Sequence, residues 1–135
     1  MPELPDIVEY LEAIERAVGG QRLEGLRIAS PFLVRSVDPP VSALEGRRLE
    51  GVRRIGKRIV FEFEGEHFAV LHLMIAGRLR RKPRGAKPPG RNGLAAFDFS
   101  DATLVLTEAG THKRASLHVV RGEAGLAEHD PGGLE

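Results

Sequence analysis

Residues 57–75 read KRIVFEFEGEHFAVLHLMI, and this stretch indicates the fold class. In its first half Ile59, Phe61 and Phe63 alternate with other side chains, so they share one face of a strand. Gly65-Glu66 predicts a tight hairpin turn. The second half is apolar at nearly every position, which is typical of a strand that is buried on both faces. We therefore expect a hairpin whose second strand is central in a β-sandwich.

Further short strands are predicted on both sides of this hairpin. They cover residues 22–29, 31–37, 48–55, 94–99, 103–108 and about 117–121, with a helical turn near residues 41–44. Between them, residues 82–93 carry many Pro and Gly among basic side chains and predict a mobile loop. The pattern as a whole predicts a mainly β fold with α, an antiparallel β-sandwich of about seven or eight strands capped by an N-terminal helix.

The N-terminal helix is predicted from the first twenty residues, MPELPDIVEYLEAIERAVGG. Apolar side chains recur at helical spacing and form one stripe that faces a core; they are Ile7, Leu11, Ile14 and Val18. Pro5 suits the first turn of a helix, and Gly19-Gly20 can end it.

A reactive amine is predicted at the start of this helix. Removal of Met1 before a residue as small as Pro2 would expose a secondary amine, whose pKa a nearby helix N-terminus lowers. Such an amine attacks a sugar aldehyde carbon to form an iminium without further proton loss, and Glu3 could exchange the protons. Two alternatives stay open: the prolines only stiffen the start of the helix, or Met1 is retained and the Pro2 nitrogen is an unreactive amide.

Composition limits the classes of protein. A chain of 135 residues fits one domain, and the absence of Cys excludes disulfides and cysteine-ligated metals in these residues. Without a long apolar run or a signal peptide, the cytoplasm is the expected location. The net charge is only +1, yet residues 78–91 hold seven of the 20 basic residues and no acidic one. Together with a second basic stretch at 47–58, this asymmetry fits a polyanionic partner better than the net charge suggests. The alternative, a solvated face with a flexible loop, is the commoner explanation of charge runs in general and stays open.

The motif Met-Pro-Glu-Leu-Pro-Asp, followed by this helix, resembles the opening of the formamidopyrimidine-DNA glycosylase and endonuclease VIII family of base-excision repair enzymes. The resemblance implies that Pro2 is a Schiff-base nucleophile and Glu3 its acid/base partner. Asp6 stands where the family usually has glutamate and would support catalysis. The stretch VRRIGKRIVFEF resembles the family's hairpin, in which a lysine projects toward the lesion, so Lys57 is the third catalytic residue that the resemblance implies.

Two further segments resemble DNA-contacting motifs of the family. HLMIAGRLR is similar to His-Leu-Gly-Met-Ser-Gly, which implies that His72 and Arg78 hold phosphates and that an apolar side chain fills the space left by an extruded nucleotide. Strand neighbours point to opposite faces, so either Met74 or Ile75 is this wedge, and the sequence does not choose.

The second segment, Thr111 to Ser116, stands where relatives have Asp-Pro-Arg-Arg-Phe-Gly. It implies DNA contacts by Lys113 and Arg114. Ala115 replaces the aromatic residue that probes base pairs, which indicates a divergent branch of the family.

The resemblance runs from residue 2 to about residue 120 and divides the chain in two. Residues 1–121 are expected to be the glycosylase N-terminal catalytic domain, and 122–135 the start of a linker toward a helix-two-turn-helix and zinc-finger half. No cofactor or metal is expected in this chain, since zinc belongs to that other half of the relatives. Phosphate contacts from one half alone should be weak, so we expect the isolated domain to be weak or inactive.

Three functional hypotheses follow. The first is a DNA glycosylase and AP lyase that removes oxidised bases and cuts the strand by β-elimination, with or without δ-elimination. Its partner would be damaged double-stranded DNA at the nucleoid, and we expect a monomer without membrane contact. The second is a catalytically inactive relative that binds damaged or single-stranded DNA. The third is a β-sandwich interaction module. The sequence does not decide between oxidised purines and oxidised pyrimidines as substrates.

Overall fold

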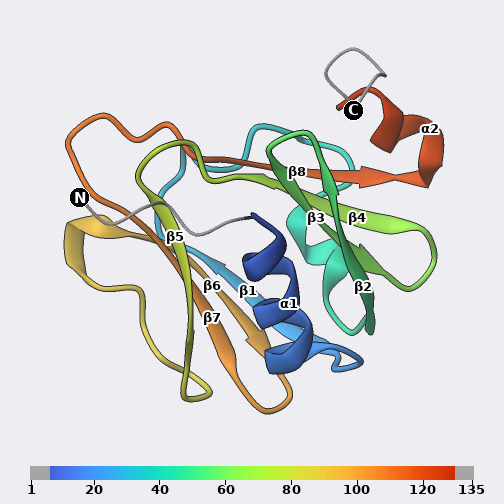
Figure 1. Ribbon diagram of the computed structural model, residues 1–135, viewed down its shortest axis with the longest axis horizontal. Coiled ribbons are helices and arrows are strands. Elements are labelled where there is room, and N and C mark those ends of the chain that lie inside the picture. The colour runs from blue at the N-terminus through green and yellow to red at the C-terminus, as the bar shows by residue number, and fades with distance from the viewer. Residues whose placement is uncertain (1–6, 130–135) are drawn as a thin grey trace.

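The computed structural model describes residues 7–129 as two packed β-sheets with a helix at each end of the chain (Figure 1). The helices are α1 (Ile7–Val18) and α2 (Gly122–Ala127), and short 3₁₀ turns cover Val41–Leu44 and Gly90–Asn92. The strands are β1 (Leu23–Ile28), β2 (Leu49–Ile55), β3 (Arg58–Phe63), β4 (His67–His72), β5 (Gly77–Lys82), β6 (Gly93–Phe99), β7 (Thr103–Glu108) and β8 (Ser116–Arg121). No helix in this part of the chain is long and apolar enough to cross a membrane.

The two sheets confirm the predicted antiparallel sandwich. Their strand orders are β1-β6-β7-β5 and β2-β3-β4-β8, so β4 is an inner strand, as its apolar sequence predicts. Aromatic rings join the inner faces: Phe61 stacks on Phe97 with centroids 5.5 Å apart, and Phe63 on Phe99 at 6.4 Å. These four side chains are fully buried. Burying rings of this size supplies much of the free energy that holds two sheets together.

Helix α1 packs on this core through its predicted apolar stripe. Ile14 and Val18 are buried, and Ile7 and Leu11 pack against the core while partly exposed. The helix lies against the sandwich with its first turn at one end of the two sheets (Figure 1). The residue that begins the described chain is therefore fixed in position by the core.

One predicted strand is wrong, and a strand that was not predicted replaces it. Residues 31–37 contain only one bridge, between Val34 and Leu117. Phe32 and Val37 in this segment are 75% and 89% exposed, whereas Leu33 between them in the sequence is 2% exposed and belongs to the core, so the segment packs on the sandwich without pairing as a strand. The missed strand is β5, which pairs with β7 at the edge of its sheet. An edge strand tolerates charged side chains because one side of it faces solvent, which is why its basic sequence conceals it.

The basic loop between β5 and β6 is irregular, as predicted, but it is attached to the sheet. Arg27 donates a hydrogen bond of 2.6 Å from Nη2 to the Ala86 carbonyl. The Gly85 amide donates to Thr103 Oγ1 at 2.8 Å. These contacts hold the loop against the outer face of its sheet.

Helix α2 covers the outer face of the second sheet. Its Leu126 is buried in a small apolar cluster with Val60, Phe68 and Val70. This cluster explains how β4 is buried on both faces. The segment that the sequence predicts as the start of a linker therefore begins with a helix packed on the sandwich.

Lowering the pH is expected to reduce the stability of the protein through two histidines near α2. The His118 ring on β8 lies 4.6 Å from the His129 ring after α2. Burial lowers the pKa of both imidazoles; His129 and Arg35 add to the effect on His118, and Arg58 to the effect on each. In the unfolded chain both imidazoles bind protons near the ordinary pKa of about 6.5, whereas in the folded state they bind protons only at lower pH. Stability should therefore be full above that pH and fall as the pH is lowered through it.

Thermal melting between pH 8 and pH 5 measures this dependence. His118→Gln should flatten the profile relative to the parent protein, because one resisted protonation is removed. Exposed His112→Gln is the matched control and should leave the profile unchanged. A parent profile that is flat across this range would contradict the prediction.

Candidate active site and nucleic-acid interface

A cleft of about 510 Å³ lies beside the first turn of α1. Its walls come from α1, the β2–β3 turn and the β4–β5 turn. It gathers five residues that the sequence predicts to act on or bind DNA, namely Lys57, His72, Met74, Ile75 and Arg78. These residues come from two separate motifs, and the fold brings them to one site.

Lys57 stands at the tip of the β2–β3 turn. Ile55 and Arg58 are the last paired residues of the two strands, so Gly56 and Lys57 alone form the turn. Gly56 has φ of 61°, a left-handed conformation that glycine adopts without steric cost. This two-residue turn leaves the Lys57 side chain exposed at the cleft.

His72 is the last residue of β4 and is partly buried at the cleft. Burial lowers the pKa of its imidazole, and the nearby charges of Arg58 and Lys57 lower it further. At neutral pH the ring is therefore uncharged, with a ring N–H available to donate. A bound phosphate would offset the cationic surroundings and raise the pKa again.

The β4–β5 turn separates the two wedge candidates. Met74 has φ of 58°, a strained conformation for a side chain other than glycine, and is 39% exposed. Ile75 is 79% exposed. Arg78 Nη1 donates to the Ile75 carbonyl at 3.0 Å and to the Gly77 carbonyl at 2.7 Å, which braces the turn.

Gly77 closes this turn, and its replacement is expected to be costly. A Cβ at this position would lie 2.3 Å from the Leu73 carbonyl oxygen. Gly77→Ala must therefore displace the backbone of the turn and should lower the free energy of unfolding by about 1–3 kcal/mol. Gly25→Ala is the control, because its nearest atom would be Asp98 Oδ2 at 3.9 Å. Equal stability of the two variants in urea would refute this account of the turn.

The β7–β8 loop lies next to the β4–β5 turn because of the strand register. His72 pairs with Ser116 at the start of β8, and Gly77 pairs with Glu108 at the end of β7. The two connections therefore leave the sheets side by side. This register brings the segment with Lys113 and Arg114 to the same end of the sandwich as the cleft.

Glu108 anchors that loop from within. Its side chain is only 2% exposed, and its carboxylate accepts hydrogen bonds from two consecutive amides, those of Arg114 at 2.9 and 3.0 Å and Ala115 at 3.1 and 3.2 Å. Lys113 Nζ donates to the carbonyls of Glu108 at 2.6 Å and Gly110 at 2.7 Å. The Lys113 ammonium thus closes the loop, while the Arg114 side chain remains exposed.

Sequence reasoning missed three residues of this region. Tyr10 and Arg54 line the cleft, and Glu108 fixes the loop. For Glu108 a signal exists, because a carboxylate ends the apolar run TLVLTE directly before the loop. Arg54 is one of the cations of the basic stretch at 47–58, but nothing in that stretch marks it out from its neighbours. Tyr10 carries no comparable signal, since a tyrosine is ordinary on the surface of a helix.

Three predicted catalytic residues, Pro2, Glu3 and Asp6, lie outside the described residues. Ile7, the first described residue, lines the cleft. Among residues 7–129, no group of three or more His, Cys, Asp or Glu side chains is arranged to hold a metal ion.

Solved structures share this fold. A crystal structure of formamidopyrimidine-DNA glycosylase from Lactococcus lactis, bound to DNA with an AP site, superposes with a TM-score of 0.81 over 94% of this chain and 48% of that chain, at 21% identity. A second complex of the same enzyme, with DNA containing a Fapy-dG lesion, gives 0.80 over 93% and 47%, at 20% identity. This chain therefore has the same fold as the matched half of these structures.

Sequence comparison makes the assignment specific. The model described as the formamidopyrimidine-DNA glycosylase N-terminal domain matches residues 1–119, so the chain belongs to the formamidopyrimidine-DNA glycosylase family. The relative from Exiguobacterium sibiricum is 30% identical over 105 residues, which are 76% of this chain and 37% of the relative. The relative from Burkholderia thailandensis is 36% identical over 90 residues, 66% and 32% respectively. The chain spans less than half the length of these relatives.

Proposed function

We propose that this chain is the catalytic half of a DNA glycosylase and AP lyase that removes oxidised bases through the N-terminal proline. The observation that carries the proposal is the cleft, which collects residues of two motifs beside the first turn of α1. Pro2 precedes Ile7, which lines the cleft, by five residues in the sequence, and five residues of extended chain span at most about 18 Å. Damaged double-stranded DNA is the proposed partner.

The proposed chemistry begins at the sugar of the damaged nucleotide. The Pro2 nitrogen forms a bond to C1′ while the bond from C1′ to the base breaks, and the base leaves with that electron pair and gains a proton. Glu3 protonates the ring oxygen as the sugar opens to an iminium. The iminium acidifies the C2′ proton, whose removal expels the 3′ phosphate by β-elimination. Water then hydrolyses the imine and restores the amine.

The described residues would hold the DNA around this reaction. Lys57 and Arg78 would contact phosphates as cations, and the neutral His72 would donate its ring N–H to a phosphate oxygen. Arg114 would contact the strand from the neighbouring loop. Lys113 donates two hydrogen bonds to carbonyl groups of its own loop. It would contact the DNA strand only through its remaining N–H donor.

Ile75 is the wedge in this proposal. Its side chain is twice as exposed as that of Met74, at 79% against 39%. The left-handed backbone of Met74 also matches the glycine of the family pattern, which leaves the next residue to project into the DNA. An apolar side chain in that place fills the space of the extruded nucleotide.

Borohydride trapping on an abasic oligonucleotide tests the activity, with the full-length protein as the reagent. We expect a covalent protein–DNA adduct, and strand cleavage when borohydride is left out. DNA binding without any adduct would contradict the proposed lyase chemistry. An oligonucleotide with an oxidised purine and one with an oxidised pyrimidine, run in parallel, would report the base preference.

One observation favours a second candidate, a damaged-DNA-binding relative without catalysis. Ala115 stands where relatives carry the aromatic probe, and it is buried at 2% exposure. Nothing at this position reaches out to test base pairs. Salt-dependent binding of abasic DNA without trapping would select this candidate.

A further inference from the structure

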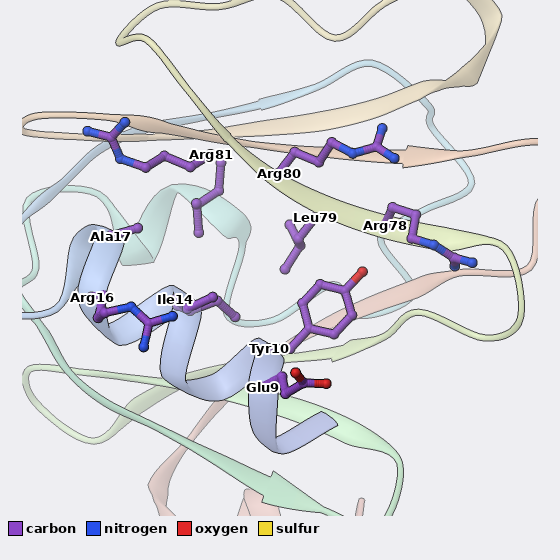
Figure 2. A pocket seen from close by; sticks show the side chains of 11 residues that line it. Glu9, Tyr10, Ile14, Arg16, Ala17, Arg78, Leu79, Arg80 and Arg81 are labelled. Atoms are coloured by element: carbon purple, nitrogen blue, oxygen red, sulfur yellow. The ribbon is translucent and has the colours of Figure 1, made fainter. Parts of the chain in front are cut away.

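A second groove opens between α1 and β5, with a volume of about 560 Å³ (Figure 2). We call it the α1–β5 groove. Its floor is apolar and includes Ile14, Leu79 and Leu104, which are 3%, 8% and 2% exposed. These residues belong to the core, so the floor is rigid. The proposed repair chemistry assigns no role to this groove.

The rim of the α1–β5 groove is strongly cationic. It carries Arg16 from α1 and Arg78, Arg80 and Arg81 from β5. Figure 2 shows these arginines rising from both walls around the apolar floor. Within residues 7–129, neither Arg16, Arg80 nor Arg81 forms an ion pair with a carboxylate. Glu9 adds one carboxylate to the four arginines that line the groove. An apolar floor below a rim with this excess of positive charge favours a ligand that combines negative charge with flat apolar surface.

The groove continues the candidate active-site cleft. Tyr10 and Arg78 line both, so one begins where the other ends. Figure 2 shows the Tyr10 ring rising from α1 toward β5 at this junction. A strand of DNA that occupies the cleft can therefore run on into the groove, with an aromatic ring at the point of passage.

The size of the groove indicates whether the DNA that enters it is single-stranded or double-stranded. Its volume falls in the range of small-molecule pockets, which suits one or two unpaired nucleotides and is too small to enclose a duplex. Sites for single-stranded nucleic acid combine a basic track for the phosphates with aromatic or apolar surfaces on which bases stack. Arg80 and Arg81 both line the groove, and Arg81 leaves β5 on the same face as Leu79 of the floor.

We propose that the α1–β5 groove binds a short single-stranded stretch of DNA that continues from the candidate active-site cleft. This inference rests on the proposed function, because it extends the DNA that occupies that cleft. It implies a preference for lesions next to a gap or an unpaired flank over lesions in an uninterrupted duplex.

The test uses the full-length protein and two DNA probes that carry a tetrahydrofuran abasic analogue. One probe is an uninterrupted duplex, and the other has a two-nucleotide unpaired gap beside the analogue. The groove variant is Arg80→Gln with Arg81→Gln. The matched control is Arg84→Gln with Arg91→Gln, which removes the same charge from the loop between β5 and β6. Dissociation constants are measured by fluorescence anisotropy over a range of salt concentrations.

The parent protein should bind the gapped probe more tightly than the duplex, and the groove variant should lose this preference. Loss of two phosphate contacts to a single strand should make the salt dependence of gapped-probe binding shallower by about 1.4 in log–log slope. The control variant should keep the preference. The proposal is overturned if the parent shows no preference, or if both variants weaken both probes by the same factor.

Borohydride trapping of the same proteins separates this inference from the proposed function. A normal trapped yield without a gap preference rejects the groove alone. A gap preference without any trapped adduct rejects the catalytic proposal and leaves the groove as a binding site for unpaired DNA.

Discussion

One additional residue ahead of Pro2 is expected to abolish the borohydride-trapped adduct of the full-length protein, leaving only the background of an enzyme-free reaction. The added peptide bond delocalises the nitrogen lone pair, so the nitrogen can no longer attack C1′. We expect the sandwich to form in the extended protein, because residues from Ile14 to Val119 supply its buried core cluster. The yield of adduct on an abasic oligonucleotide, resolved by denaturing electrophoresis, measures the effect.

The control places the same additional residue at the other end of the protein. Both proteins should bind DNA with a tetrahydrofuran analogue equally well, since this analogue offers no aldehyde carbon to the nucleophile. An unchanged adduct yield from the N-terminally extended protein would mean that the nucleophile is another group. Lys57 would then be the first to examine, because its ammonium lies at the same cleft.

Glu108→Ala is expected to lower the free energy of unfolding by about 2–4 kcal/mol, the largest stability change among the substitutions considered. The substitution removes a buried carboxylate and leaves the amides of Arg114 and Ala115 without their acceptor. An unsatisfied buried amide costs free energy because it has lost its water as well. Urea denaturation measures the change.

Two further variants serve as comparisons for Glu108→Ala. Glu108→Gln retains one carbonyl acceptor and should lose less stability than Glu108→Ala. Glu50→Ala removes an exposed carboxylate from β2 and should change stability by less than about 0.5 kcal/mol. A Glu108→Ala protein as stable as Glu50→Ala would show that the loop does not depend on this carboxylate.

Much of the fold was predictable from local patterns. The alternation around Phe61 and Phe63 identifies β3, and the double-sided apolar run identifies β4 as an inner strand. The stripe through Ile14 and Val18 identifies the core face of α1. Each of these patterns is a reliable guide because the residues that its spacing places on one face are the residues that pack against the sandwich core.

The errors concern segments whose secondary structure depends on the strands that they pair with in the folded sheets. Residues 31–37 are rich in apolar side chains like a strand, yet they begin with a proline and make only one bridge, and Phe32 and Val37 are exposed. β5 is rich in cations because it is an edge strand, and only pairing with β7 reveals it. Edge position is a property of the assembled sheet, which no local window of sequence contains.

The candidate site was predicted in its parts rather than in its arrangement. The motifs named Lys57, His72 and Arg78, and the structure shows them lining one cleft. The sequence could not decide whether Met74 or Ile75 is the wedge. The exposure of each side chain depends on the left-handed conformation of Met74, in a turn that Gly77 closes. The role of Lys113 as a closure of its own loop depends on carbonyl groups that only the folded loop brings together.

The most direct test of the central claim is to locate the trapped bond. The full-length protein is reduced with borohydride on an abasic oligonucleotide, digested with protease and nuclease, and mapped by mass spectrometry. We predict that the residual sugar is attached to the nitrogen of an N-terminal Pro2. Attachment to any lysine, or recovery of an adduct from a chain that still begins with Met1, would contradict the account.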